Sequence, residues 1–201
     1  IIRLKKNFHT GMIVTCVGKK SHFNFVKSIN ENSIINRVVE HYFQHKHKNS
    51  KIWSYLDRGS DERQYNSPNI NIDVGSFTSA KFGKFKEYHT SLDNLNCINN
   101  NQLNISLEAL KEIIELINLN GIYKSTKFCE PFYTKYKLYP DYPNHKEKVK
   151  FREEVIMDNV VSYSNGKRDL IEIANINNLY LKDLKKYSEK LIKNKIIKRL
   201  N

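Results

Sequence analysis

The feature that most limits the fold of this chain is a short β-branched run followed directly by a helical pattern. Residues 11–18, Gly-Met-Ile-Val-Thr-Cys-Val-Gly, place apolar side chains between two glycines. Such a run predicts a buried strand in the middle of a sheet. In residues 31–47 the apolar side chains recur at the three- and four-residue spacing of an amphipathic helix. A strand followed by a helix indicates an α/β fold.

The succession of predicted strands and helices continues to residue 119. Residues 52–56 and 70–77 predict two further strands, the second with alternating apolar side chains. Residues 106–119 predict a helix with Ser106 as its N-cap and Gly121 as its terminator. We therefore expect an α/β domain over residues 1–122, built as a mixed sheet with flanking helices.

The second half of the chain begins with an aromatic segment. Residues 123–149 interleave tyrosines and phenylalanines with prolines and lysines, which predicts an extended linker. Its aromatic rings could offer platforms for a sugar, but packing between domains is the favoured interpretation. Helical patterns follow at 151–163, 170–174 and 181–197. Three helices in succession favour a small winged-helix domain over residues 150–201.

The chain has a net charge of +13, which raises the question of a nucleic-acid partner. Residues 181–201 hold eight basic and two acidic side chains. The candidate phosphate contacts are Lys182, Lys185, Lys186, Lys190 and Lys193. The alternative is the solvated face of an amphipathic helix in a lysine-rich chain, and it is favoured because arginine and amide base readers are scarce there.

Cysteine usage and apolar run lengths bear on location. Cys16, Cys97 and Cys129 form no CxxC pair, which argues against a disulfide framework and a cysteine-built zinc site. This pattern predicts a reducing, cytoplasmic compartment. No apolar run approaches the length of a transmembrane helix, so no membrane partner is expected. The chain starts at Ile1 without a signal-peptide pattern, which suggests a piece of a longer protein.

Two segments concentrate reactive side chains. In residues 59–68, Asp61, Glu62 and Arg63 place two carboxylates and a cation in one loop after a predicted strand. A charged surface loop explains that segment equally well. In residues 87–95, His89 precedes Asp93 by four residues, the arrangement of a metal ligand with an outer carboxylate. Taken alone, His89 is more readily explained as a structural or exposed histidine.

A third group of histidines lies in the first predicted helix. His41 and His45 are separated by four residues and could chelate a metal from one helix face. The order of the residues is not His-Glu-x-x-His, so a solvated helix face is the favoured interpretation.

The two reactive segments together resemble one bacterial family. The strings are Gly-Ser-Asp-Glu-Arg-Gln-Tyr…Ser-Pro with a following Val-Gly-Ser, and then Glu-Tyr-His-Thr-Ser-Leu-Asp-Asn-Leu. They are similar to those of aminopeptidase-like proteins with a C-terminal winged helix, often associated with polysaccharide biosynthesis. That family is similar in turn to zinc aminopeptidases, glutamate carboxypeptidases and glutaminyl cyclases.

The resemblance implies roles for particular residues. His89 corresponds to a zinc ligand, and its positioning neighbours are Tyr88, Thr90 and Asp93. The pocket-lining candidates for catalysis are Asp61, Glu62, Arg63 and Tyr65. Among these, Arg63 is suited to holding a substrate carboxylate by a bidentate contact. The chain departs from the family at Lys19 and Lys20, where an acidic residue is usual, and at Asn66, where a cysteine is usual.

The resemblance also implies that the site is incomplete. A catalytic zinc requires about three protein ligands and a water, and the family places the other ligands and the catalytic glutamate upstream. We expect one zinc ion, with a second as an alternative, and a small peptide-like or amino-sugar substrate. The chain is then the C-terminal portion of a zinc-dependent aminopeptidase-like hydrolase. The alternative is a non-catalytic binding protein with a basic winged-helix module for nucleic acid or protein. The sequence does not indicate an oligomeric state.

Overall fold

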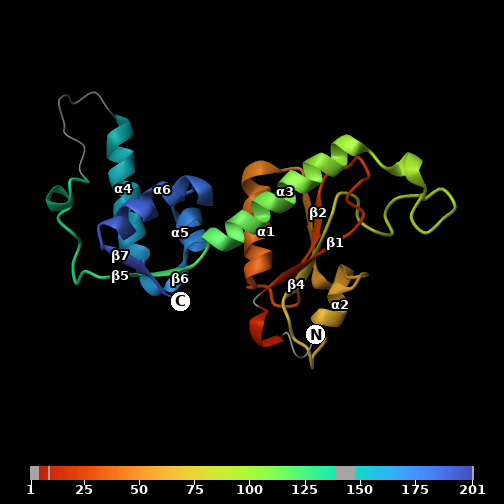
Figure 1. Ribbon diagram of the computed structural model, residues 1–201, viewed down its shortest axis with the longest axis horizontal. Helices are drawn as coiled ribbons and strands as arrows, with labels where there is room; N and C mark the ends of the chain where they lie inside the picture. The colour runs from red at the N-terminus through yellow and green to blue at the C-terminus, as the bar shows by residue number, and fades with distance from the viewer. Residues whose placement is uncertain (1–4, 9, 139–147, 201) are drawn as a thin grey trace. The chain divides into compact units, whose positions relative to one another are not determined.

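The computed structural model describes residues 5–8, 10–138 and 148–200, which form two compact units, Ile1–Ile117 and Asn118–Asn201 (Figure 1). The first unit holds a four-stranded sheet in the order β1-β4-β2-β3. Its strands are β1 (Gly11–Val14), β2 (Asn24–Val26), β3 (Lys51–Trp53) and β4 (Val74–Thr78). β1 pairs parallel with β4 and β2 with β3, whereas β2 and β4 are antiparallel. The mixed sheet expected from the sequence is thus confirmed.

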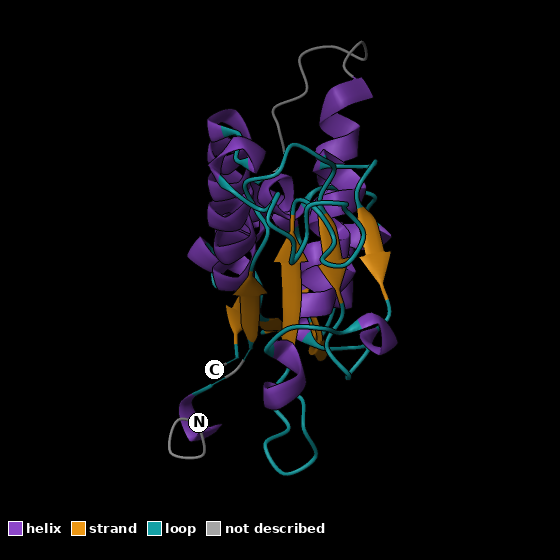
Figure 2. Ribbon diagram, turned by 90° about the vertical axis from the view of Figure 1, so that its right-hand side faces the viewer, coloured by secondary structure: helices purple, strands orange, loops and turns teal. Residues whose placement is uncertain are grey.

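Helices cover both faces of this sheet, as Figure 2 shows. They are α1 (Ile34–Lys46), α2 (Glu62–Tyr65) and α3 (Asn100–Leu119). On one face, Phe77 of β4 packs against Phe43 of α1 and against Phe23. On the other face, Ser76 of β4 donates a hydrogen bond to Glu62 of α2. α3 lies beside α1, and Glu112 of α3 adds to burial in raising the pKa of Tyr42.

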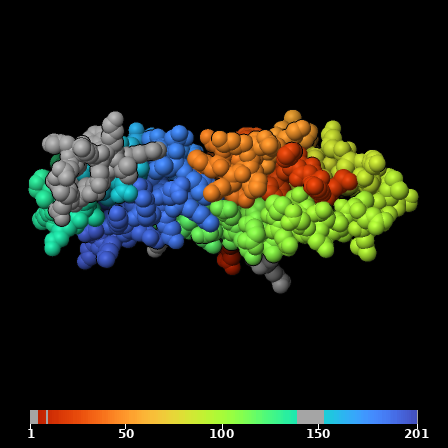
Figure 3. Space-filling model, turned by 90° about the horizontal axis from the view of Figure 1, so that it is seen from above, coloured from red at the N-terminus to blue at the C-terminus, as the bar shows by residue number. Residues whose placement is uncertain are grey.

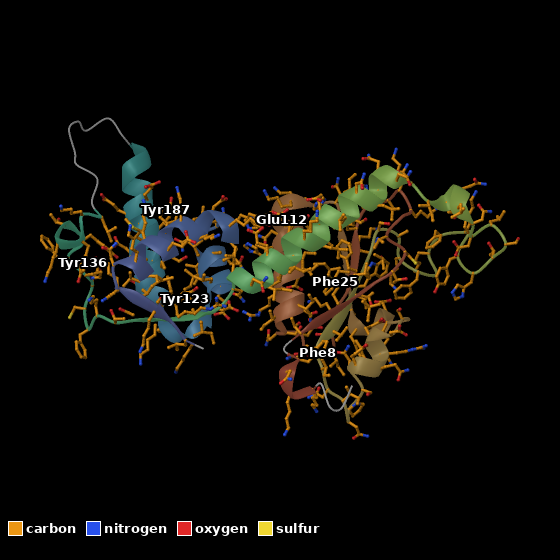
Figure 4. The ribbon with its side chains drawn as sticks, viewed as in Figure 1. Phe8, Phe25, Glu112, Tyr123, Tyr136 and Tyr187 are labelled. Atoms are coloured by element: carbon orange, nitrogen blue, oxygen red, sulfur yellow. The ribbon has the colours of Figure 1, made fainter. Side chains whose placement is uncertain are left out.

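The strand positions differ from the sequence prediction in two ways. β1 lies at the edge of the sheet instead of its middle, and Val14 is 46% exposed. The buried positions belong to β4, which is buried on both faces, and to β2, which the sequence analysis missed. β2 is only three residues long, too short for a detectable period, although Phe25 is completely buried (Figure 4).

Helix α3 begins six residues earlier than predicted. The side chain of Asn99 accepts a hydrogen bond from the Gln102 amide and so caps the helix. Ser106, the predicted N-cap, lies inside the helix instead. Its hydroxyl donates to the Val17 carbonyl at 2.8 Å and fixes the helix to the segment after β1. Residues 100–105 are mostly polar, with only Leu103 and Ile105 apolar, and therefore showed no helical period.

The second unit packs three helices with a three-stranded antiparallel sheet. The helices are α4 (Lys148–Tyr163), α5 (Leu170–Ile176) and α6 (Leu181–Lys193). The sheet has the order β6-β5-β7, with β5 (Ile122–Ser125), β6 (Asn165–Asp169) and β7 (Ile197–Arg199). Leu181, Leu184 and Leu191 of α6 are fully buried. Three helices and a small sheet form the winged-helix unit that the sequence predicts.

The start of the predicted linker and the end of the last predicted helix need correction. β5 overlaps the start of the range 123–149 and is the central strand of the second sheet, because it pairs with both β6 and β7. Its Tyr123 is buried (Figure 4). Residues 139–147 of that range lie outside the described residues. α6 ends at Lys193, where Lys195 adopts a left-handed backbone conformation, and residue 197 opens β7.

Candidate functional site

Glu62 lies inside the fold with both of its carboxylate oxygens hydrogen-bonded. Its side chain is completely buried, and its Oε1 accepts hydrogen bonds from the amides of Gly59 and Ser60 at 2.8 and 3.1 Å. Its Oε2 accepts a 2.6 Å bond from the Ser76 hydroxyl. Burial alone would raise the pKa of Glu62, but these hydrogen bonds outweigh it and hold the pKa below its usual range. With both oxygens occupied, Glu62 fixes the loop to the sheet.

Asn66 completes the attachment of α2. Its side-chain amide donates to the carbonyls of Glu62 and Val74 at 2.7 Å each, and its oxygen accepts from the Ile29 amide. The residue is buried with its amide group satisfied, so the asparagine serves packing at the position where the resembled family usually has a cysteine.

The remaining candidates of the first segment lie on the surface of α2. Asp61 and Arg63 are exposed, and Tyr65 is half-buried. α2 runs back along β4, with Asn66 bonded to Val74 at the start of that strand. In the described part of the chain, no hydrogen bond or ion pair joins Arg63 or Tyr65 to His89.

His89 lies at the tip of a short turn. It is exposed, adopts a left-handed backbone conformation with φ of 57°, and stacks on the Tyr88 ring at a centroid distance of 4.0 Å. The Thr90 hydroxyl donates to the Glu87 carbonyl at 2.8 Å and closes the turn. Asp93 is exposed, and its backbone amide donates to the Thr90 carbonyl. Tyr88 and Thr90 therefore shape the turn that presents His89.

The described residues do not by themselves form a zinc site. Within residues 5–8, 10–138 and 148–200, no three histidine, cysteine or acidic side chains gather as metal ligands. A catalytic zinc requires about three protein ligands, so His89 alone does not suffice. His41 is buried, and its ring lies 4.5 Å from that of His45 with the two planes tilted by 46°, which corrects the interpretation of this pair as a solvated face.

A cluster of lysine and aromatic side chains at the edge of the first sheet was not predicted from the sequence. Lys81 is buried after β4, and its Nζ donates to the Asp57 carbonyl at 2.8 Å. The same Nζ lies 5.8 Å from the ring centroid of Trp53, the single tryptophan of the chain. The run Lys81-Phe-Gly-Lys-Phe-Lys86 was the available signal, but only the fold places it beside Trp53.

The lysines of α6 are partly engaged in ion pairs within the second unit. Lys186 lies 3.0 Å from Glu153 of α4, and Lys185 lies 3.8 Å from Glu189. Lys190 and Lys193 are exposed. Arg199 lies in β7, where its guanidinium donates to the carbonyls of Asn118 and Asn120 near the end of α3. These contacts favour a structural role for much of the terminal positive charge.

We predict that the chain binds short duplex DNA only weakly. Because several α6 cations are paired, the dissociation constant should be no tighter than non-specific binding, roughly 10⁻⁴–10⁻⁶ M at physiological salt. A salt titration by fluorescence anisotropy measures it. The variant Lys190→Gln/Lys193→Gln should behave like Lys48→Gln/Lys111→Gln, which removes two exposed lysines of the first unit. Submicromolar affinity lost only in the α6 variant would contradict the prediction.

Both units match known protein families. Residues 3–120 match a family described as a domain of unknown function, DUF4910. The chain belongs to the DUF4910 family. The stretch after the DUF4910 domain, residues 121–199, matches a winged helix-turn-helix family. Together with the relatives below, these matches confirm the resemblance found in the sequence.

Two relatives of the DUF4910 chain come from Clostridium acetobutylicum. One is named a polysaccharide biosynthesis protein with aminopeptidase-like domain, and it is 31% identical over 200 residues, 96% of this chain and 44% of the relative. The other is the crystal structure of a candidate peptidase, which is 29% identical to this chain and superposes with a TM-score of 0.83. The match covers 99% of this chain and 44% of the peptidase chain. The chain thus spans less than half the length of each of these relatives.

Among the helices of the described residues, none combines the length and the apolar character needed to cross a bilayer.

Proposed function

We propose that this chain is the C-terminal portion of a zinc-dependent aminopeptidase-like hydrolase and that His89 supplies one of its metal ligands. The observation that carries the proposal is the family membership combined with the exposed His89 turn. An imidazole on a stiff, solvent-facing turn is free to bind a metal, because no hydrogen bond in the described residues occupies its ring nitrogens. Tyr88 and Thr90 orient it.

The other ligands and the general base would come from the part of the relatives' length that this chain does not span. When bound, zinc would supply a Lewis acid for a scissile carbonyl and lower the pKa of its bound water. The exposed guanidinium of Arg63 is available to hold the carboxylate of a peptide-like or amino-sugar substrate. Because the residues present do not complete the metal site, no reaction step is assigned to them.

The metal content of a full-length protein that carries this domain tests the proposal. We expect His89→Ala to reduce bound zinc from a stoichiometric amount to less than about a tenth, since loss of one of three ligands removes much of the site. His22→Ala, another exposed histidine of the same unit, should leave the zinc content unchanged. Elemental analysis after dialysis gives the readout, and peptidase activity should follow it.

The 201-residue chain provides a second comparison. It should bind zinc weakly and hydrolyse no aminoacyl substrate, because a single histidine ligand does not hold a catalytic ion. Stoichiometric zinc retained by the full-length His89→Ala protein would refute the ligand assignment.

A further inference from the structure

A cavity of about 340 Å³ opens at one edge of the first sheet, within the size range of small-molecule sites. The carboxyl ends of β1 and β4 and the amino ends of β2 and β3 meet there, because β2 and β4 are antiparallel. Its wall is unusually basic, with five lysines beside the single tryptophan: Lys19, Lys20, Lys51, Lys81, Lys84 and Trp53. We infer that this cavity is a binding site for a small phosphorylated ring compound, such as a sugar phosphate or a nucleoside phosphate.

The charge of the wall is largely uncompensated. No aspartate or glutamate is among the described residues that line the cavity. Lys19 pairs with Glu87 at 3.0 Å, whereas Lys20, Lys51 and Lys84 have no carboxylate within ion-pair distance in the described part of the chain. Like charges gathered in one cavity repel, and a bound anion would relieve that repulsion. A phosphate group offers three oxygens to such lysines.

Lys81 forms the inner end of the wall. It is 7% exposed, and burial lowers its pKa despite the nearby carboxylates of Asp57 and Glu62. Its Nζ donates to the Asp57 carbonyl and lies 3.3 Å from the centroid of the Phe82 ring, which leaves a third N–H donor on the ammonium group. A phosphate in the cavity would compensate this partly desolvated cation as well as the exposed ones.

Trp53 supplies the part of the site that would contact a ring. Its Nε1 donates to the side-chain oxygen of Asn24 at 2.9 Å, so the indole is held in one orientation. The Nζ atoms of Lys81 and Lys84 lie 5.8 and 6.0 Å from its ring centroid, which places the cations beside the aromatic surface. A ligand with a phosphate next to a sugar or base could contact lysine and indole together.

The cavity is also close to the His89 turn. The Lys19–Glu87 ion pair joins the segment after β1 to that turn, and Phe85 of the cavity wall packs edge-on against Tyr88 at 5.4 Å. The site goes beyond the proposed hydrolase function and does not depend on it, since neither the lysines nor Trp53 is a proposed metal ligand.

Because Trp53 is the single tryptophan of the chain, its fluorescence reports directly on the cavity. The intact 201-residue chain would be titrated at constant ionic strength with inorganic phosphate, glucose 6-phosphate, uridine monophosphate and neutral uridine. Isothermal calorimetry on the same solutions detects binding that does not alter the fluorescence. We expect saturable binding of the phosphorylated ring compounds, with at least one of them tighter than inorganic phosphate. Tighter binding of glucose 6-phosphate would identify the ring as a sugar, and tighter binding of uridine monophosphate would identify it as a nucleoside.

The variant Lys51→Gln/Lys84→Gln tests the role of the lysines, with Lys111→Gln/Lys124→Gln, two exposed lysines outside the cavity wall, as the matched control. Each lysine that contacts the phosphate should contribute roughly tenfold, so the double variant should bind about a hundredfold more weakly, and the control should be unchanged. Both lysines are exposed, so the folded state should persist, which circular dichroism checks. The inference is overturned if none of the phosphate-containing compounds binds at millimolar concentration, or if uridine binds as tightly as uridine monophosphate. It is also overturned if the double variant and the control lose affinity equally.

Discussion

Replacing Glu62 with alanine is expected to destabilise the first unit by about 3 kcal/mol, because buried donors would lose their acceptor. The amides of Gly59 and Ser60 and the hydroxyl of Ser76 all donate to this carboxylate. Urea unfolding followed by Trp53 fluorescence isolates the effect, since the single tryptophan lies in this unit. Far-UV circular dichroism, which senses both units, should show a second, unshifted transition.

The neighbouring Asp61 provides the matched control. It is exposed, and its side chain makes no capping hydrogen bond to α2. Asp61→Ala should therefore change the free energy of unfolding by less than about 0.5 kcal/mol. Equal effects of the two substitutions would contradict the assignment of Glu62 as the buried anchor of the loop.

The same carboxylate gives the prediction a pH dependence. The folded state holds the pKa of Glu62 below its ordinary value, so its stabilisation is complete above the unfolded pKa of about 4.3. As the pH falls through the lower folded-state pKa, the stabilisation from ionised Glu62 is lost. The difference in unfolding free energy between the unsubstituted chain and Glu62→Ala should therefore be constant at neutral pH and shrink in acid.

Gly75→Ala is expected to have a comparable effect through overpacking. A methyl group at Gly75 of β4 would overlap the ring of Phe25 and approach the Val26 carbonyl oxygen within 3.0 Å. Phe25 is completely buried and has no space into which to rotate. The central strands β2 and β4 would have to separate, which should lower the free energy of unfolding by roughly 2–3 kcal/mol. The loss is measurable as a lower urea midpoint of the unfolding transition followed by Trp53 fluorescence.

Gly18→Ala is the comparison at a glycine of the same unit. A methyl group there would lie 3.3 Å from the side-chain ends of Ile98 and Leu103, both of which are partly exposed and able to shift. Gly18→Ala should therefore lower the free energy of unfolding by less than about 1 kcal/mol. If both glycine substitutions proved equally mild, close packing of β4 against β2 would not limit the sheet as we infer.

The predictable parts of the fold are those with a long apolar period. The helix over Ile34–Lys46 and the helices of the second unit follow from side-chain spacing, because a helix repeats its buried face over several turns. A strand of three residues is too short to show an apolar period, so β2 and β7 could not be predicted from the sequence. β1 was placed centrally because its composition resembles that of a buried strand, but pairing order depends on long-range contacts that composition does not encode.

The candidate site was predictable only at the level of the segments. The strings around Glu62 and His89 identified the family, yet the sequence could not separate a buried anchor from a surface carboxylate. Asp61 and Glu62 are adjacent and chemically alike, but the direction of a short helix turns one outward and the other onto Ser76. The lysine cavity was missed for a related reason, since its wall comes from segments before and after several strands.

The central position of β5 has a consequence for the order in which the second unit can form. β5 follows α3 directly, but its partners β6 and β7 lie much later in the chain. During synthesis its backbone amides and carbonyls leave the ribosome long before Arg199, so both of its edges are at first available to other chains. Pairing such distant segments requires closure of long loops, which makes sheet formation a late event in folding. Nascent chains of this protein therefore expose β5 to strand-mediated aggregation until β6 and β7 are made.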